Sequence, residues 1–364
     1  MSSLKPKGHI WLRDETKPFE RRTALTPMVA SKLIDAGFAV SVEKSSTRCF
    51  PDNEYISIGA TMEPTGSWVN APRHCFILGI KELPEDETPL IHQHIFFAHA
   101  YKGQKGWEKI IGRFKRGGGI LLDLEFLVDE RGRRVAAFGR WAGFAGAALA
   151  VDIWAHQQLH GSTPFPEVKL VKNEAELLDS LRSRLLVAVQ RTTHFPRAIV
   201  IGSQGRCGTG AADLFRKLEF PASNFSLWDL SETAKGGPFN EILEHDIFVN
   251  CVLVQGDMKP FLTRGMLEQS RRLRVISDVS CDPTSPRNPI PIYDSVTTFS
   301  DPVIRLDTAN LLDLTAIDHL PSLLPCESSQ DFGGQIIPHL LTLGTRNPVW
   351  TRAQQLYESM EAKL

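Results

Sequence analysis

A chain of 364 residues is long enough for about two domains, each with its own hydrophobic core. Its 41 basic and 42 acidic side chains nearly balance, so the charge gives no reason to expect a nucleic acid partner. The six cysteines lack C-x-x-C spacing, which argues against a zinc site and against the disulfide framework of a small secreted protein. The longest apolar stretch, 141–154, is interrupted by Asp152, so no membrane segment is expected.

The first part of the chain alternates apolar stretches with helical patterns, which indicates a largely parallel sheet. Strands are expected at 9–12, 39–42, 75–80, 95–98 and 120–123. Helices are expected at 27–36 and 107–116. An alanine-rich helix over 140–160 would then lead into a second domain, and its small residues permit close packing.

The middle of the chain carries a glycine-rich turn between an apolar stretch and a helical pattern. Ala198–Gly202 leads into Gly205 and Gly208, an arrangement typical of a dinucleotide-binding strand, turn and helix. Asp229 ends another apolar stretch, 225–228, where such a fold places the acid that binds the adenosine ribose and repels a 2′-phosphate. These signals predict NAD rather than NADP. By itself the turn is also compatible with a structural role or a mononucleotide loop, because Ser203 stands where the common pattern has glycine.

Further strands are expected at 246–251 and 273–279, and helices at 334–343 and 349–362. We therefore predict an α/β protein with two Rossmann-like, doubly wound parallel-sheet domains and an active-site cleft between them. Residues 1–138 plus 325–364 would form the substrate and catalytic domain. Residues 139–324 would form the NAD-binding domain.

Basic side chains follow several predicted strands of the first domain. Arg22, Lys81, His99 and Arg134 are of the types that bind substrate carboxylates and transfer protons. Glu82 and Glu125 are candidate modulators of that chemistry, with a solvated surface pair as the alternative. Arg13 and Arg21 are expected to be structural or solvated.

Two other groups of residues invite a chemical interpretation. His92, His94 and His99 lack an acid or thiolate partner at ligand spacing, so no metal site is expected. Cys207 and Cys251 would lie near the carboxyl edge of the second sheet, where they could form a disulfide or remain two small buried thiols.

Longer segments, among them ETKPFERRTALTP at 15–27 and IDHLPSLLP at 317–325, carry a family resemblance that covers nearly the whole chain. The other segments are 81–85, 97–102, 123–127, 132–139, 236–239, 278–280 and 288–293. Together they resemble the fungal saccharopine dehydrogenases of the NAD-dependent, L-lysine-forming type. This family belongs to the alanine dehydrogenase and transhydrogenase superfamily.

The resemblance implies roles for individual residues. Lys81 and His99 match the catalytic acid–base pair, and Glu82 and Glu125 match the carboxylates that modulate it. The positions that hold saccharopine correspond to Arg22, Arg134, Phe138, Ser280, Cys281 and Asp282. The positions around NAD correspond to Arg133, Gly205, Arg206, Asp229, Thr233, Leu253, Val279, Ile317, Asp318, His319 and Leu320.

The implied reaction is oxidative cleavage of L-saccharopine to L-lysine and 2-oxoglutarate, the last step of lysine biosynthesis through 2-aminoadipate. Hydride transfer would precede imine hydrolysis. Two alternatives are an alanine dehydrogenase-like oxidoreductase, which would need fewer arginines, and a non-catalytic NAD sensor, which would need only Asp229.

The expected partners are small molecules, namely saccharopine, lysine and 2-oxoglutarate, with neither nucleic acid nor membrane, and the resemblance implies a monomer. Ala362-Lys363-Leu364 is a variant of the Ser-Lys-Leu peroxisomal signal. A peroxisomal import receptor is therefore a candidate partner, and the protein is expected in the cytoplasm, the peroxisome or both. The alternative for this tripeptide is a charged helical tail.

Overall fold

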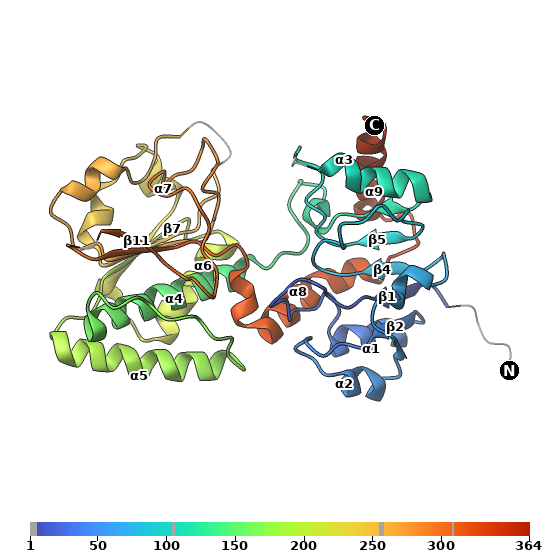
Figure 1. Cartoon of the computed structure of the whole chain (residues 1–364), viewed down its shortest axis with the longest axis horizontal. Helices are drawn as coiled ribbons and strands as arrows, with labels where there is room; N and C mark the ends of the chain where they lie inside the picture. The colour runs from blue at the N-terminus through green and yellow to red at the C-terminus, as the bar shows by residue number, and fades with distance from the viewer. Residues whose placement is uncertain (1–5, 104–105, 255–257, 308) are drawn as a thin grey trace. The chain divides into compact units, whose positions relative to one another are not determined.

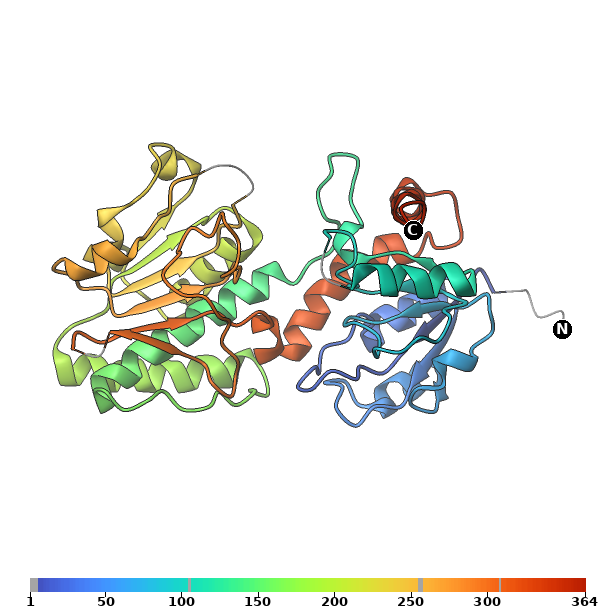
Figure 2. The same cartoon turned by 45° about the horizontal axis from the view of Figure 1, so that its top comes forward.

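The computed structural model describes residues 6–103, 106–254, 258–307 and 309–364. The chain divides into two compact units, and each is described by itself. Unit 1 consists of Met1–Phe138 together with Pro325–Leu364, and unit 2 consists of Gly139–Leu324. In Figures 1 and 2 the red C-terminal helices lie among the blue and teal elements of the N-terminal part, so the end of the chain returns to unit 1.

Unit 1 is built on a six-stranded sheet in the order β3-β2-β1-β4-β5-β6, and the strand pairs among its described residues are all parallel. This is the strand order of a Rossmann sheet. β1 lies near the middle, with Ile10 opposite both Val40 and Phe76. The strands are β1 (His9–Leu12), β2 (Ala39–Glu43), β3 (Thr61–Glu63), β4 (Phe76–Leu78), β5 (Gln93–Ile95) and β6 (Ile120–Leu121).

Helices cover both faces of this sheet (Figure 1). One face carries α1 (Pro27–Asp35), α2 (Asp52–Ser57) and α8 (Pro325–Leu340), and the other carries α3 (Trp107–Gly117). α9 (Pro348–Glu361) packs beside the edge strand β6 and against α3. The short 3-10 helices of the unit are η1 (Ser67–Asn70) and η2 (Leu124–Phe126). A helix was predicted over 334–343, whereas α8 already begins at Pro325 and ends at Leu340. Proline is well suited to a first helical position, where its missing N–H costs no hydrogen bond.

Unit 2 contains a second six-stranded sheet in the order β11-β12-β10-β9-β7-β8. β11 is antiparallel to β12, whereas the other strand pairs within the described part of this sheet are parallel. The strands are β7 (Ala198–Ile201), β8 (Phe225–Trp228), β9 (Ile247–Asn250), β10 (Val275–Asp278), β11 (Ile304–Asp307) and β12 (Leu312–Thr315). Both units thus have the predicted α/β architecture with parallel-dominated sheets.

The two faces of the second sheet are covered differently. α4 (Gly139–His160) and α6 (Arg206–Lys217) pack on the face that presents Val200 and Val275, and α5 (Glu174–Thr192) packs on α4. The other face packs against loops and short helices. The short helices of unit 2 are α7 (Leu230–Thr233), η3 (Ala222–Asn224), η4 (Asn240–Glu244), η5 (Arg264–Glu268) and η6 (Leu320–Leu323).

The small residues of α4 allow its backbone to approach α6 closely. A Cβ on Gly143 would lie 1.7 Å from the carbonyl oxygen of Cys207, and one on Gly210 would lie 1.8 Å from that of Arg140. Larger residues would force the helices apart, so the glycines position α6 and the turn that precedes it. None of the described helices is both long and apolar enough to cross a lipid bilayer.

Candidate functional site

The glycine-rich turn of unit 2 connects β7 to α6. Gly202 has a φ of +87°, which favours glycine, and Gly205 is the N-cap of α6. A Cβ on Gly208 would lie 2.0 Å from the carbonyl oxygen of Gly202, so only glycine fits there. At Gly205 the nearest such contact is 3.4 Å, which leaves the N-terminus of the helix accessible. This arrangement fits the pyrophosphate of a dinucleotide.

Asp229 lies beside this turn, directly after β8. Its carboxylate accepts hydrogen bonds from the N–H of Gln204 (2.8 Å) and of Leu230 (2.9 Å). The side chain of Glu232 accepts from the N–H of Asp229 (2.7 Å) and completes a capping box on α7. Because a carboxylate has about four acceptor sites, two remain for ribose hydroxyls. These donors and acceptors fit NAD.

The turn from Ser280 to Asp282 follows β10 and is organised by the buried Asp278. One carboxylate oxygen of Asp278 accepts from Asn250 Nδ2 (3.0 Å) and from Ser280 Oγ (2.6 Å). The other accepts from the hydroxyl of Tyr293 (2.7 Å). Cys281 has a φ of +50°, a conformation that side chains rarely adopt and that these bonds hold in place. The sequence pointed to the turn but not to Asp278 as its anchor.

The other residues assigned to NAD are distributed over both units. In unit 2, Arg206 begins α6, Leu253 follows β9 and is exposed, and Val279 follows β10. Thr233 ends α7 and donates to the carbonyl oxygen of Asp229 (2.8 Å). Ile317, Asp318, His319 and Leu320 follow β12. Arg133 lies in unit 1, where its guanidinium pairs with Asp129 (2.9 Å).

Cys207 lies in the first turn of α6 and Cys251 directly follows β9. Burial raises the pKa of Cys251, with a contribution from Cys207. All six cysteines fall within the described residues, which contain no disulfide bond. The disulfide between Cys207 and Cys251 stays a prediction.

In unit 1 the backbone at Lys81 is held by two charged side chains that the sequence left as structural or unassigned. The carboxylate of Glu15 accepts from the N–H of Ile80 (2.6 Å) and of Lys81 (3.0 Å). Arg13 donates to the carbonyl oxygen of Lys81 and to Glu15. Burial raises the pKa of Glu15, although Arg13 and the two N–H groups oppose the shift. These contacts fix the segment that carries Lys81.

Arg22 forms a buried, two-bond pair with Glu20. Its Nε and Nη2 donate to the two carboxylate oxygens at 2.8 and 2.6 Å, and its guanidinium lies 4.5 Å from the ring centroid of Phe138. Phe138 stacks in turn on Phe332 of α8. Burial raises the pKa of Glu20, but the charge and hydrogen bonds of Arg22, with a contribution from Lys81, hold it below its usual value.

His99 lies between the two predicted carboxylate modulators. Its Nε2 is 3.6 Å from Glu82, its Nδ1 is 3.8 Å from Glu125, and its side chain is 46% exposed. His99 has a φ of +51°, which places its backbone in the left-handed region that residues other than glycine rarely adopt. The structure thus brings three of the predicted residues together at the carboxyl ends of β4, β5 and β6.

Glu125 connects this histidine to two cations. Its carboxylate accepts from Lys102 (2.6 Å) and from Arg134 (2.9 Å). Burial raises the pKa of Glu125, but Lys102, Arg134 and His99 outweigh burial and lower it. Glu125 is therefore held as a carboxylate between positive groups, and Lys102 is a member of the cluster that sequence reasoning left without a role.

A second carboxyl group, Asp123, lies directly behind Glu125. It is buried and accepts from the N–H of Glu125 (2.8 Å) and of Ala98 (3.3 Å). Burial raises its pKa to about 7, with a further contribution from the charge of Glu125. Asp123 therefore fixes the loops that carry both Glu125 and His99, a role that its place two residues before Glu125 could have suggested.

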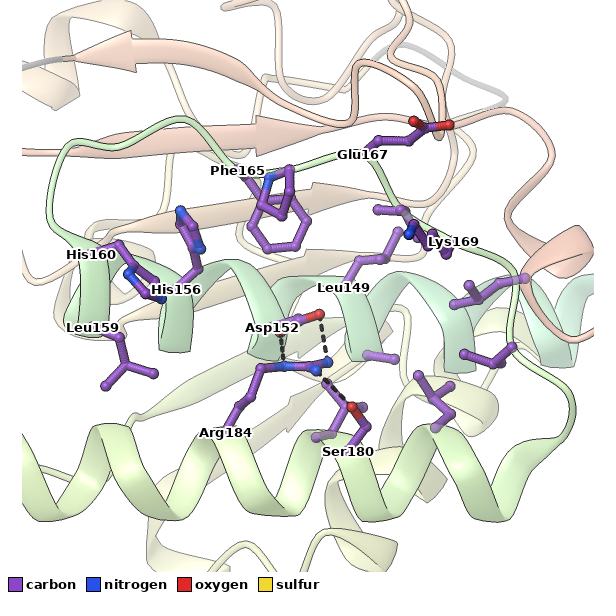
Figure 3. A pocket seen from close by; sticks show the side chains of 17 residues that line it. Leu149, Asp152, His156, Leu159, His160, Phe165, Glu167, Lys169, Ser180 and Arg184 are labelled. Carbon is purple, nitrogen blue, oxygen red and sulfur yellow. Dashed lines mark hydrogen bonds and ion pairs between the residues drawn. The ribbon is translucent and has the colours of Figure 1, made fainter.

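Each unit contains a cavity of its own. A cavity of about 890 Å³ in unit 1 is lined by Lys17 and Glu82 and by further acidic residues, so it adjoins the His99 cluster. A cavity of about 300 Å³ in unit 2 lies between α4, α5 and the segment 165–169. Figure 3 shows the ion pair between Asp152 and Arg184 in this second cavity. None of the predicted site residues lines the cavity in unit 2.

Comparison with known proteins agrees with this organisation. Residues 11–145 match the family model described as "Alanine dehydrogenase/PNT, N-terminal domain". The fold is similar to that of an L-alanine dehydrogenase structure, with a TM-score of 0.66 at 15% identity over 96% of this chain and 93% of that one.

Two curated relatives are similar over nearly their whole length. The NAD(+)-dependent, L-lysine-forming saccharopine dehydrogenase of Schizosaccharomyces pombe is 50% identical over 98% of this chain and 99% of its own. The enzyme of the same name from Yarrowia lipolytica is 50% identical over 96% of each chain. The chain therefore belongs to the family of NAD-dependent, L-lysine-forming saccharopine dehydrogenases.

Proposed function

We propose that this protein catalyses the NAD-dependent oxidative cleavage of L-saccharopine to L-lysine and 2-oxoglutarate, a step of lysine biosynthesis. The observation that carries the proposal is 50% identity to curated enzymes of this activity over almost the whole chain. The cluster of His99, Glu82 and Glu125 in unit 1 and the turn beside Asp229 in unit 2 support the proposal, because they combine acid–base groups with a turn that fits NAD.

Recognition of the substrate rests on arginine. Saccharopine carries three carboxylates around a secondary amine, and a guanidinium binds a carboxylate through two hydrogen bonds. We assign this role to Arg22 and Arg134. Glu20 fixes the plane of the Arg22 guanidinium, and Glu125 holds that of Arg134. We further assign Phe138 and the turn Ser280–Asp282 to the same substrate.

The first chemical step oxidises the amine. The C–H bond at the glutamyl carbon breaks and its electron pair leaves as hydride, while the amine nitrogen loses a proton to Lys81 and a C=N bond forms. Bound NAD supplies the hydride acceptor. The backbone of Lys81 is anchored by Glu15 and Arg13, which keeps the base at a fixed position.

The second step hydrolyses the imine. His99 takes a proton from a water molecule as its oxygen attacks the imine carbon, and passes this proton to the imine nitrogen. The hydroxyl proton of the resulting carbinolamine then moves to the same nitrogen through His99 as the C–N bond breaks, which releases the amine of lysine and the ketone of 2-oxoglutarate. Glu82 and Glu125 lie 3.6 and 3.8 Å from the ring, where their charges stabilise the imidazolium that forms.

Replacement of the two proposed acid–base groups tests this mechanism. We expect Lys81→Met and His99→Gln each to lower kcat for saccharopine about 100-fold or more. Lys115→Met, at an exposed position of α3, is the matched control and should leave kcat unchanged. A Lys81→Met enzyme with an unchanged kcat would exclude the assigned role of Lys81.

We also propose that the protein is shared between cytoplasm and peroxisome through the exposed tripeptide Ala362–Leu364. Removal of the tripeptide from a fluorescent fusion should abolish any peroxisomal signal. A peroxisomal signal that survives the deletion would contradict this proposal.

We further propose that the protein is a monomer. Light scattering during gel filtration should give the mass of one chain, and the mass of a dimer would contradict this proposal.

A further inference from the structure

Three potential metal ligands converge at the amino-terminal edge of the sheet in unit 1. His9 is the first residue of β1, and Cys75 directly precedes β4, which pairs with β1. His74 is the neighbour of Cys75 in the preceding turn, which is closed by a hydrogen bond from the N–H of Cys75 to the carbonyl oxygen of Pro72 (2.9 Å). Lys81 and His99 follow the carboxyl ends of the strands, so this group is separate from the proposed catalytic cluster.

The distances among the three side chains suit a single ion. His9 Nδ1 lies 3.2 Å from Cys75 Sγ, and the ligand atoms of His9, His74 and Cys75 all lie within 4.8 Å of one another. In a tetrahedral zinc site, bonds of about 2.0–2.3 Å place neighbouring ligand atoms about 3.5 Å apart. The spacing of His9 and Cys75 is close to this value, and the exposed side chain of His74 has room to rotate toward them.

A further contact resembles the environment of a metal-bound histidine. The other ring nitrogen of His9, Nε2, lies 2.9 Å from the hydroxyl of Ser41, which is buried on β2. Metal-ligating histidines generally have such a partner on the second nitrogen, because it fixes the tautomer and directs the lone pair to the metal. Ser41 thus directs Nδ1 of His9 toward Cys75.

We propose that His9, His74 and Cys75 bind a Zn²⁺ ion, with water as the fourth ligand. The thiol of Cys75 transfers its proton to solvent as the Zn–S bond forms, and both imidazoles bind as neutral ligands. One thiolate and two imidazoles favour zinc over magnesium or calcium, which prefer oxygen ligands. His74 is exposed whereas Cys75 is buried, so the ion approaches from the side of His74.

Cobalt titration of the full-length, untagged protein tests the site directly, because Co²⁺ occupies zinc sites and a cobalt–thiolate bond has a charge-transfer absorption. We expect this absorption to appear with stoichiometric Co²⁺ and to disappear when Zn²⁺ is added. Cys75→Ser should abolish it, and His74→Gln should weaken Zn²⁺ binding at least about 10-fold. Ser41→Ala should weaken binding about 10-fold through the orientation of His9.

A second histidine pair in the chain provides the matched control. His156 and His160 lie one turn apart on α4, with ring centroids 4.7 Å apart, and could bind a metal without a thiolate. Their replacement by glutamine should leave the charge-transfer absorption and its midpoint unchanged. His74→Gln alters only an exposed side chain, so its effect does not depend on refolding of the core.

A missing charge-transfer absorption, or unchanged zinc affinity in both Cys75→Ser and His74→Gln, would overturn the proposal. Because cobalt binding is measured without substrate, the result is independent of saccharopine turnover.

Discussion

The pair formed by Glu20 and Arg22 offers a quantitative test of the electrostatics in unit 1. We consider Glu20→Gln, which preserves the shape of the side chain but removes its charge and directs one amide N–H toward the guanidinium. In the native protein the N–O contacts are 2.6 and 2.8 Å, and the side chains of Glu20 and Arg22 are only 2% and 5% exposed. The variant therefore leaves a buried cation without its counterion.

The expected loss can be calculated from these contacts. Two unit charges about 4 Å apart interact by about 4 kcal/mol at an effective dielectric constant of 20, and the loss of one partner from a buried pair costs about 3–5 kcal/mol. The ring of Phe138, 4.5 Å from the guanidinium, retains about 1 kcal/mol of that stabilisation. We expect the free energy of unfolding to fall by about 3 kcal/mol.

Urea unfolding followed by tryptophan fluorescence at pH 7 measures this loss. The control is Glu87→Gln, because the pair of Glu87 with Arg116 has side chains that are 74% and 48% exposed. An exposed pair of this kind contributes less than about 1 kcal/mol. A loss below about 1 kcal/mol in Glu20→Gln would refute the reasoning, since the buried pair would then behave like the surface pair.

The same pair has a defined dependence on pH. Because the folded-state pKa of Glu20 lies below the ordinary value of 4.5, its contribution to stability is fully present above that pH and is lost as the pH falls through the folded-state pKa. The difference in stability between the native protein and Glu20→Gln should therefore narrow below about pH 4. A constant difference down to pH 3 would contradict the assigned pKa shift.

Three further changes test other parts of the account. Asp229→Asn should lower the preference for NAD over NADP, measured as the ratio of the two kcat/KM values, about 10- to 100-fold, because the charge that repels a 2′-phosphate is lost. An unchanged ratio would exclude a role of Asp229 in choosing the cofactor. Gly208→Ala should lower the melting temperature, because the added Cβ would lie 2.0 Å from the carbonyl oxygen of Gly202. At Gly205 the corresponding contact is 3.4 Å, so Gly205→Ala should mainly raise the Kd for NAD in a fluorescence titration. Equal melting temperatures for the two variants would contradict the packing argument. Asp123 has a folded-state pKa of about 7 against an ordinary value of 3.8, so its ionisation lowers the stability of the protein as the pH rises between these values. Asp123→Asn should therefore show a smaller fall in melting temperature from pH 5 to 7 than the native protein. Parallel curves of melting temperature against pH would contradict the raised pKa of Asp123.

Much of the fold was predictable because its signals are local. The apolar stretch at 198–202 with the following glycines predicted β7 and α6, and the alternation before residue 138 predicted a parallel sheet. β3, β11 and β12 went unpredicted, since each is three or four residues long and contains polar side chains. β5 ends at Ile95, although the apolar run suggested a strand from 95 to 98.

The candidate site was predictable only in part. Lys81, His99, Glu82 and Glu125 follow strand ends, which made them visible in the sequence. Charged residues that tertiary packing buries cannot be told apart in the sequence from charged residues that are exposed to solvent. Glu15 and Glu20 look like solvated loop residues, yet both are buried against arginine side chains. Likewise, His9 and Cys75 are distant in sequence and become neighbours only because β1 pairs with β4.

The most direct test of the proposed activity is the absorbance of the reduced nicotinamide when purified protein is given NAD with either saccharopine or alanine. We expect NADH to form with saccharopine alone, together with equal amounts of lysine and 2-oxoglutarate, and far more slowly with NADP. Reduction of NAD by alanine, or measurable NAD binding without turnover of saccharopine, would contradict the proposed function.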